Sequence, residues 1–387
     1  MPCFPFLCGG KVSPPNKGFS EVDEEVSGIS NVIMYSYKDM RSATDDFSPK
    51  NKIGEGGFGS VYKGQLKNGD LVALKVLSSL SSQGVREFLA ELTVITEVTH
   101  ENLVKLHGCC VEDKHRILVY GYCENNSLAR TLLGGALSSS HFDWKTRSMI
   151  SLGVARGLSF LHDVVRPCII HRDIKASNIL LDKDLCPKIS DFGLAKLMPS
   201  HMTHVTTRVA GTIGYLAPEY AIRGQVTRKA DIYSFGVLLM EIVSGRFNTN
   251  TRLPYEEQYL LEWTWTLHER KELVLLVDPS LEGQFDAEQA CRFLQIALLC
   301  TQDTPKLRPS MSNVVKMLTG ELSIDGKVIT KPGLISDFVH LKNKDGQKER
   351  SSENFSDSTS DKVDTSATNT EMSYGTMTFT AVYDRSS

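Results

Sequence analysis

Three stretches of the chain carry apolar side chains at the spacing of a helix face. In residues 81–98 the apolar stripe consists of Val85, Phe88, Leu92 and Ile95. Residues 143–162 begin with an Asp that can cap a helix, and apolar positions recur through them at the same period. Residues 231–243 are apolar nearly all round and are followed by Gly245, so the pattern predicts a buried helix with a glycine end.

Shorter apolar runs predict strands in the first third of the chain. Residues 71–76 and 117–120 are such runs, rich in Val, Leu and Ile. Val61 and Tyr62 also favour a strand, directly after a glycine-rich stretch. The part of the chain beyond residue 123 is predicted to be mainly helical. We therefore expect an α+β fold, with a small antiparallel sheet and one key helix first and a larger helical part second.

The composition narrows the class of protein. The 387 residues are more than one core usually serves, and 43 Lys+Arg against 46 Asp+Glu leave no charge excess that would favour a nucleic-acid partner. An odd number of cysteines, 9, without a C-x-x-C pair favours a reducing compartment. The longest apolar runs are far too short to cross a bilayer, so we do not expect a one-chain receptor.

Both ends of the chain are predicted to be tails. Residues 1–34 contain prolines, glycines and serines that oppose helix and strand, and residues 35–46 form a lead-in with a short capped helix. Pro at position 2 excludes N-myristoylation, whereas Cys3 and Cys8 are either palmitoylation sites or idle thiols on an apolar terminus. Residues 321–387 are expected to be disordered, as an inert terminus or as a phosphorylated regulatory arm.

A glycine-rich stretch precedes the strand at Val61. Gly54, Gly56 and Gly59 form the pattern G-x-G-x-x-G, in which the missing Cβ atoms let the backbone approach phosphates. Dinucleotide-binding folds share this pattern, but there it opens a helix. Because Val61 and Tyr62 favour a strand, the stretch is predicted to turn back as a hairpin lid over a nucleotide.

Two charged residues stand out among apolar neighbours. Lys75 lies in a predicted strand, and Glu91 lies beside the apolar stripe of the helix over 81–98. One interpretation is a surface lysine and a solvated glutamate. The other is an ion pair in which Lys75 also binds the α- and β-phosphates of ATP.

The strongest chemical signal is the stretch His171-Arg172-Asp173-Ile174-Lys175-Ala176-Ser177-Asn178, which Asp191-Phe192-Gly193 follows. These letters match the patterns H-R-D-x-x-x-x-N and D-F-G of enzymes that transfer phosphoryl groups. In this interpretation Asp173 accepts the proton of the substrate hydroxyl and Lys175 reaches the γ-phosphate, while Asn178 and Asp191 hold magnesium. The alternative is an ordinary polar loop after a strand.

All these motifs in this order resemble a eukaryotic protein kinase domain over residues 47–320. Ala217-Pro218-Glu219 and Arg308 continue the resemblance toward the end of this range. The resemblance implies a two-lobed fold, with an N-lobe at 47–122 and a C-lobe at 123–320, and it implies ATP and Mg²⁺ as cofactors. It also implies which residues surround the nucleotide, namely Ile53, Gly54, Glu55, Gly56, Gly57, Phe58, Gly59, Ser60, Val61, Ala73, Lys75, Tyr120, Cys123 and Leu180. Among these, Tyr120 would be the gatekeeper of the pocket behind adenine.

Finer features resemble one branch of this family. Lys175 and the stretch 211–215 are similar to serine/threonine kinases, in which Thr212 would hold Asp173 and Lys175. Cys109-Cys110-Val111-Glu112 and Arg308-Pro309-Ser310-Met311 resemble plant receptor-like kinases, and the chain is identified as a member of the receptor-like cytoplasmic kinases. Gly121 replaces the usual hinge Glu, but the backbone carbonyl that adenine needs is retained.

The resemblance implies partners and a location. We expect protein substrates, including the kinase itself, an upstream receptor kinase, and a role in plant signalling such as stress or cold responses. No nucleic-acid partner is expected. The expected location is cytoplasmic, at the inner face of the plasma membrane, with acylated Cys3 and Cys8 as the peripheral attachment.

Two other classes of protein remain as alternatives. A pseudokinase scaffold would normally lack Lys75, Asp173 or Asp191, and all three are present. A nucleotide-binding oxidoreductase would have a helix after Gly59 and no use for Asp173 or Asp191.

Arg172 suggests a regulatory switch. It directly precedes Asp173, and its guanidinium has donors that suit a phosphate. Thr206 and Thr207 lie in the middle of the segment from Asp191 to Glu219, so a phosphate on either is predicted to reach Arg172. The alternative is that Arg172 only pairs with a nearby carboxylate.

Overall fold

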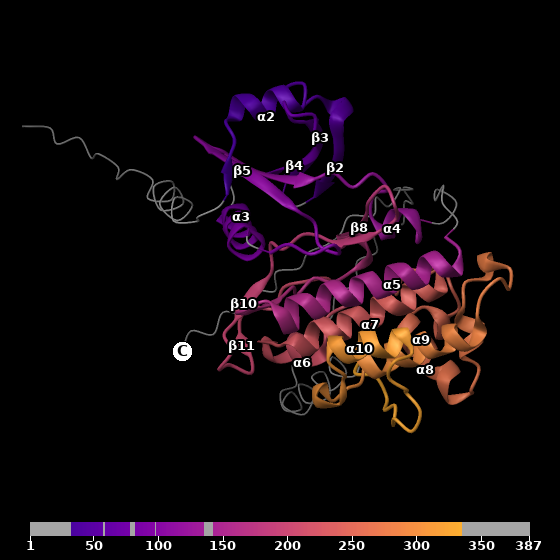
Figure 1. The fold of residues 1–387 in the computed structure, drawn as a ribbon. Coiled ribbons are helices and arrows are strands. Elements are labelled where there is room, and N and C mark those ends of the chain that lie inside the picture. The colour runs from indigo at the N-terminus through magenta and orange to yellow at the C-terminus, as the bar shows by residue number, and fades with distance from the viewer. Residues whose placement is uncertain (1–31, 57–58, 78–81, 97, 135–141, 335–387) are drawn as a thin grey trace, which may run out of the picture.

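A six-stranded sheet forms the N-terminal lobe (Figure 1). The computed structural model describes residues 32–56, 59–77, 82–96, 98–134 and 142–334. The strand order is β1-β5-β6-β4-β3-β2, and every neighbouring pair is antiparallel except β1 with β5. The strands are β1 (Ile33–Met34), β2 (Lys52–Gly56), β3 (Gly59–Gln65), β4 (Leu71–Leu77), β5 (Leu106–Glu112) and β6 (His115–Gly121).

The two faces of this sheet have different roles. Val72 and Leu74 are fully buried in a small outer core with Met40 of the short helix α2 (Tyr37–Ala43), which Ser36 caps as the sequence predicts. Since side chains alternate along a strand, Ala73 and Lys75 of β4 point to the opposite face. That face looks toward the second lobe.

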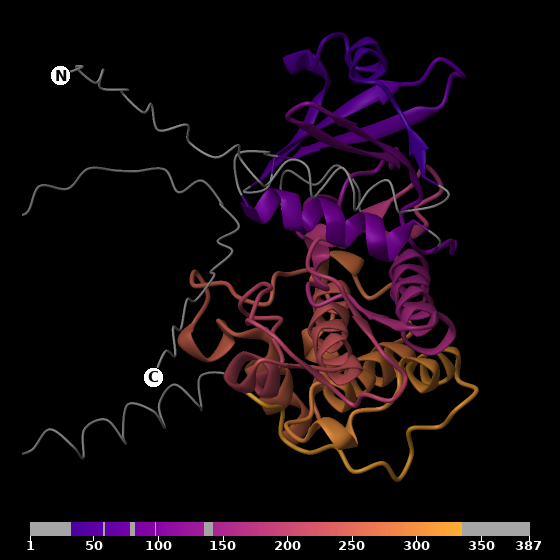
Figure 2. The same cartoon turned by 90° about the vertical axis from the view of Figure 1, so that its left-hand side faces the viewer.

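Helix α3 (Ser82–Ile95) covers the inner face of the sheet, and Figure 2 shows it between the sheet and the lower lobe. Phe88, Leu92 and Ile95 of the predicted stripe are at most 1% exposed. The helix ends at Ile95, before the predicted end at residue 98. It carries Glu91 into the space between the lobes.

The C-terminal lobe is mainly helical, as predicted. Asp143 caps α5 through a hydrogen bond from Thr146 N, and α5 continues into one π-helical turn, Phe160–Val164. Nearly all of α7 is buried, and the helix ends at Gly245 in the left-handed conformation with φ 66°. The helices are α4 (Leu128–Thr131), α5 (Trp144–Ser159), α6 (Pro218–Arg223), α7 (Arg228–Ser244), α8 (Leu260–Glu269), α9 (Ala287–Cys300) and α10 (Met311–Thr319).

In the described part of this lobe, three small two-stranded sheets carry its loops. They pair β7 (Cys168–Ile170) with β10 (Lys196–Met198), β8 (Ile179–Leu181) with β9 (Pro187–Ile189), and β11 (Val205–Thr206) with β12 (Gln225–Val226). Residues 171–178 therefore lie between β7 and β8, and residues 190–195 lie between β9 and β10. The two predicted chemical motifs are thus loops that neighbouring strands hold side by side.

The tails are shorter than the sequence predicts. Residues 33 and 34 pair with β5, and Tyr35 N donates to Cys109 O at 2.8 Å. The prediction of disorder from residue 321 onward was wrong for residues 321–334, because Leu322, Ile324, Ile329 and Leu334 pack against the core of the lobe. These four positions are separated by 2, 5 and 5 residues, which is neither a sustained helix period nor a sustained strand period, so no periodic signal marks the stretch.

The remaining tail predictions concern residues that the structure does not describe. Cys3 and Cys8 lie outside the described residues, as do residues 335–387. Among the helices of the described part, none has the length and apolar character that crossing a membrane requires.

Candidate active site

A buried aspartate at the start of α7 holds the loop of residues 171–178. Asp231 accepts hydrogen bonds from His171 N at 2.7 Å, from Arg172 N at 2.8 Å and from His162 Nε2 at 3.0 Å. Burial opposes ionisation of Asp231, yet these partners keep its pKa below the usual range. The carboxylate fixes a backbone in which Arg172 has a φ of 72°.

Sequence reasoning missed this role of Asp231. The available signal was an ionisable residue within a stretch that is otherwise apolar on every side, because such a residue needs a partner when it is buried. The partners come from a loop about sixty positions earlier in the chain, so the sequence alone did not name them.

Asp173 lies at the centre of a polar cluster. Its Oδ1 accepts from Thr212 Oγ1 at 2.7 Å, and its Oδ2 lies 2.8 Å from Lys175 Nζ and 3.1 Å from Asn178 Nδ2. Lys175 Nζ also donates to Thr212 Oγ1 at 2.8 Å. Asp173 is 7% exposed, so one carboxylate is held in a fixed position at the edge of the interlobe space.

A second cluster joins the two lobes. Lys75 Nζ forms an ion pair with Glu91 Oε1 and lies 2.7 Å from Asp191 Oδ1. The hydroxyl of Tyr120 donates to the other oxygen of Glu91. The structure therefore brings Lys75, Glu91 and Asp191 together, and it adds Tyr120, for which the sequence predicted only a place at the pocket.

Burial sets the electrostatics of this second cluster. Burial disfavours charge on Lys75, but Asp191 and Glu91 outweigh it and raise the pKa of Lys75, so the lysine stays protonated. The same lysine keeps the pKa of Asp191 below its usual value in spite of burial. Burial raises the pKa of Glu91, which has no exposed surface. Lys75 and Asp191 are thus a charged pair between the lobes.

The glycine-rich stretch is a hairpin, as predicted, and a strand follows Gly59 where an oxidoreductase would have a helix. Gly59 has a φ of 146°, and a Cβ there would lie 1.9 Å from Val76 O. Only glycine fits this position. Gly57 and Phe58 at the tip lie outside the described residues.

The other predicted nucleotide contacts come from both lobes. Val61 on β3 lies opposite Lys75 on β4, and Ala73 lies two residues before Lys75 on the same strand. Leu180 lies on β8 of the second lobe. Val61, Ala73 and Leu180 are half-buried. Tyr120 ends the buried part of β6, and Cys123 follows in the connection between the lobes. Ile53, Gly54, Glu55, Gly56 and Ser60 belong to the β2–β3 hairpin.

Asn178 and Asp191 have the chemistry of a magnesium site. Asn178 Nδ2 donates to Asp173 O at 2.9 Å, and this bond turns the amide nitrogen away and leaves the amide oxygen as a ligand. Carboxylate and amide oxygens are hard ligands that Mg²⁺ prefers, and it usually completes its shell with phosphates and waters. Within the described residues, no group of three or more His, Cys, Asp or Glu side chains forms an all-protein metal site. The two residues therefore fit a metal that a phosphate helps to hold.

Arg172 is buried and bonded to both ends of the following segment. Its guanidinium donates to Leu194 O at 2.8 Å, to Arg208 O at 2.8 Å and to the hydroxyl of Tyr220. Among the described residues no carboxylate lies within ion-pair distance of it. Thr206 is exposed on β11, and Thr207 N donates to Gly224 O at 3.0 Å.

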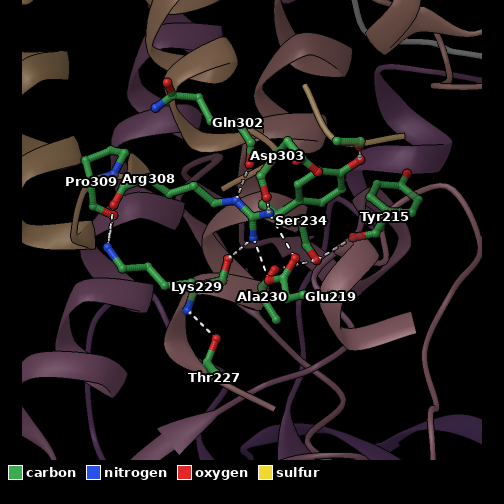
Figure 3. Close-up of polar contacts among 12 residues, drawn as sticks. Tyr215, Glu219, Thr227, Lys229, Ala230, Ser234, Gln302, Asp303, Arg308 and Pro309 are labelled. Carbon is green, nitrogen blue, oxygen red and sulfur yellow. Dashed lines mark hydrogen bonds and ion pairs between the residues drawn. The ribbon is translucent and has the colours of Figure 1, made fainter. Parts of the chain in front are cut away.

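The end of that segment is tied to the body of the lobe. Arg308 binds Glu219 through two hydrogen bonds, Nη1 to Oε1 at 2.7 Å and Nη2 to Oε2 at 2.9 Å (Figure 3). Arg308 is 1% exposed, so the pair is buried, and it joins the two motifs on which the resemblance at the end of the domain rests. It fixes the start of α6 just after the loop that carries Thr212.

Comparison with known proteins agrees with this geometry. A family model described as "Protein kinase domain" matches residues 47–318. The chain belongs to the protein kinase family. The kinase is 71% identical over 325 residues to Cold-responsive protein kinase 1 of Arabidopsis thaliana, which covers 84% of this chain and 83% of that protein.

Longer proteins also match the kinase. A probable LRR receptor-like serine/threonine-protein kinase of Arabidopsis thaliana is 54% identical over 317 residues, which are 82% of this chain but only 30% of that protein. A second receptor-like kinase of this kind is 52% identical over 322 residues, 83% of this chain and 31% of its own length. The kinase is thus a plant-type serine/threonine protein kinase, and ATP is its substrate.

Proposed function

We propose that this kinase transfers the γ-phosphate of ATP to protein hydroxyls with Asp173 as the catalytic base. The observation that carries the proposal is the fixed position of Asp173, which Thr212, Lys175 and Asn178 hold from three directions. A base must lie at a defined place beside the hydroxyl that it deprotonates.

The other residues supply charge and position. Phosphoryl transfer passes through a state in which negative charge spreads over the phosphoryl oxygens, so the protein mainly orients groups and provides countercharge. Lys75, held by Glu91, binds the α- and β-phosphates, and Lys175 binds the γ-phosphate. Asn178 and Asp191 would hold Mg²⁺, which supplies further positive charge when bound. The β2–β3 hairpin covers the phosphates and excludes water.

The test compares Asp173→Asn with the wild type in a peptide phosphorylation assay. We expect loss of most turnover with nearly unchanged ATP affinity, because Asp173 acts on the substrate hydroxyl and not on the nucleotide. Lys75→Met serves as the contrast, since it should weaken ATP binding as well. Full turnover in Asp173→Asn, or phosphotyrosine as the main product, would refute the assignment.

We also propose that autophosphorylation at Thr206 or Thr207 switches the kinase on through Arg172. Arg172 already donates to Arg208 O, one residue after Thr207, so a phosphate on this stretch is close enough to replace that carbonyl. A doubly charged phosphate is a better acceptor for a guanidinium than a neutral carbonyl. The new contact would order the segment that carries Thr212.

A double-mutant cycle tests this switch. Loss of both threonines to Ala and the change Arg172→Ala should each remove most activity, and their effects should not add because both remove one shared contact. The measurement is the initial rate on a peptide substrate. Additive losses would show that Arg172 does not bind the phosphate.

Membrane attachment and an upstream receptor kinase are further parts of the proposal. Cys3 and Cys8 would carry two acyl chains, and two are the useful number because one chain binds only marginally. Cys3→Ser with Cys8→Ser should move a fluorescent fusion from the plasma membrane to the cytosol, whereas an unacylated wild type would refute this attachment.

The likeness to receptor-like kinases and to a kinase named for cold response supports a place below a receptor in stress signalling. Loss of phosphorylation at Thr206 or Thr207 in plants without the receptor would test that place.

A further inference from the structure

The part of the chain that follows the matched kinase domain has a defined place on the lobe. The family model ends at residue 318, but the structure describes the chain to residue 334. We call residues 329–334 the C-terminal strap. Pro332 and Gly333 are buried, and Ile329 and Leu334 pack against the core of the lobe.

Hydrogen bonds join the strap to the end of α9 and to α7. Gln302 Oε1 accepts from Thr330 N at 3.1 Å and from Thr330 Oγ1 at 3.0 Å. The hydroxyl of Tyr233 donates to Gly333 O at 2.7 Å, and Asp303 N donates to Lys331 O at 3.3 Å. The bonds of Gln302 and Tyr233 end on buried or half-buried residues of the strap, so the strap is a specific part of the structure.

The three residues that bind the strap, Gln302, Tyr233 and Asp303, also hold Arg308. Figure 3 shows Gln302 and Asp303 beside Arg308. Arg308 Nε donates to Gln302 O at 2.7 Å, and Arg308 Nη2 donates to Asp303 O at 3.2 Å. The guanidinium also lies over the ring of Tyr233, 5.0 Å from its centroid. Gln302, Tyr233 and Asp303 therefore both bind the strap and position the guanidinium that binds Glu219.

The strap also touches the start of α6 directly. A Cβ on Gly333 would lie 3.0 Å from Pro218 Cγ and 2.8 Å from Asp303 Oδ1. Pro218 is the first residue of α6 and precedes Glu219. The strap thus packs against both the ion pair and the backbone that the ion pair fixes.

We propose that the C-terminal strap positions the later part of the segment from Asp191 to Glu219, which carries Thr212. Bracing Arg308 and Pro218 keeps α6 in place, and the loop before α6 carries Thr212, which contacts Asp173 and Lys175. Tyr233, Gln302 and Thr330 are positioning residues in this arrangement, since none of them touches the reacting groups. Because Thr212 of this loop holds Asp173, which acts on the substrate hydroxyl, the protein substrate depends on the loop more than ATP does.

The test uses the full-length chain and two matched pairs of variants. Thr330→Val keeps the shape of the side chain and removes its hydroxyl, whereas Thr330→Ser keeps the hydroxyl. Gly333→Ala forces the strap away from Pro218, and Ser323→Ala is its control because the Ser323 hydroxyl bonds only to its exposed neighbour Asp325. Tyr233→Phe removes the bond to Gly333 but keeps the ring under Arg308.

We expect Thr330→Val, Tyr233→Phe and Gly333→Ala to raise KM for a peptide substrate by about threefold or more while KM for ATP stays within about twofold. Amide exchange in residues 212–223 should become faster. Thr330→Ser and Ser323→Ala should behave as the wild type. If Gly333→Ala does not fold, the two milder variants decide.

A purely structural strap would give a different pattern. In that case the variants would lower Tm and speed exchange within residues 329–334, but both KM values and exchange in residues 212–223 would stay unchanged. That result would overturn the proposal. Since exchange is measured without catalysis, it also separates this outcome from an error in the assignment of Asp173.

Discussion

The hydroxyl of Tyr120 allows a sharp test of how the Lys75–Glu91 pair is held. Tyr120→Phe keeps the ring in place and removes the hydroxyl that donates a hydrogen bond to Glu91 Oε2. Glu91 has no exposed surface, so water cannot replace that donor without opening the site. A hydrogen bond to a charged group contributes about 1.5–3 kcal/mol, so we expect a loss of about 2 kcal/mol at neutral pH.

The sign of the pH effect follows from the pKa of Glu91. Burial already raises this pKa, and the Tyr120 hydroxyl is one of the groups that lower it, so the variant should raise it further. A raised carboxyl pKa means that stability is present at acid pH and is lost as pH rises through the folded pKa. The variant should therefore lose more stability at about pH 8 than at about pH 5. Activity is expected to need a charged Glu91 paired with Lys75. The acid limb of the rate profile should therefore move to higher pH.

The measurements are thermal unfolding and the pH profile of kcat/KM. A loss of about 2 kcal/mol corresponds to a Tm lower by roughly 4–8 °C. Tyr62→Phe is the control, because Tyr62 lies in the same lobe and its hydroxyl has no hydrogen-bond partner among the described residues. An unchanged Tm together with an unchanged acid limb would show that the hydroxyl does not support Glu91.

Other predictions concern groups away from that hydroxyl. Arg308→Lys should cost about 2–3 kcal/mol and raise peptide KM, because lysine cannot make the two parallel bonds to its carboxylate partner; unfolding and steady-state kinetics check this. Burial raises the pKa of Glu87 to about 7, so wild-type stability should fall as pH rises through that value, and Glu87→Gln should flatten the dependence of Tm on pH between about 5 and 8. A parallel dependence in both proteins would contradict this. Gly245→Ala should lower stability by about 2–3 kcal/mol, because φ is 66° and the new Cβ would lie 1.9 Å from Asp278 Oδ2; Gly69→Ala, with positive φ but open space, should cost less.

The sequence by itself determined the order and type of the elements that carry the site. The glycines before Val61 and the strand preference after them predicted a hairpin, and the structure has one. The stripe through Phe88 and Leu92 and the apolar run before Gly245 predicted α3 and α7. These features follow from local backbone preference and from the period of apolar positions, which adjacent residues record. Short motifs also predicted the chemistry, because each needs its residues at a set spacing along one loop.

Only the tertiary structure decided how buried polar groups are paired. The bond from Tyr120 to Glu91 joins residues 29 positions apart, Asp231 binds a loop 60 positions earlier, and Tyr233 binds the strap across 100 positions. No periodic pattern records such contacts, because each partner comes from another element and the choice depends on which elements pack together. The strap illustrates this best, since its sequence resembles the start of a polar tail. In the structure, Gln302 bonds to Thr330, and Tyr233 and Pro218 lie against Gly333. The order of the strap comes from the free energy of satisfying buried groups on the finished lobe, and that surface does not exist before the lobe has folded.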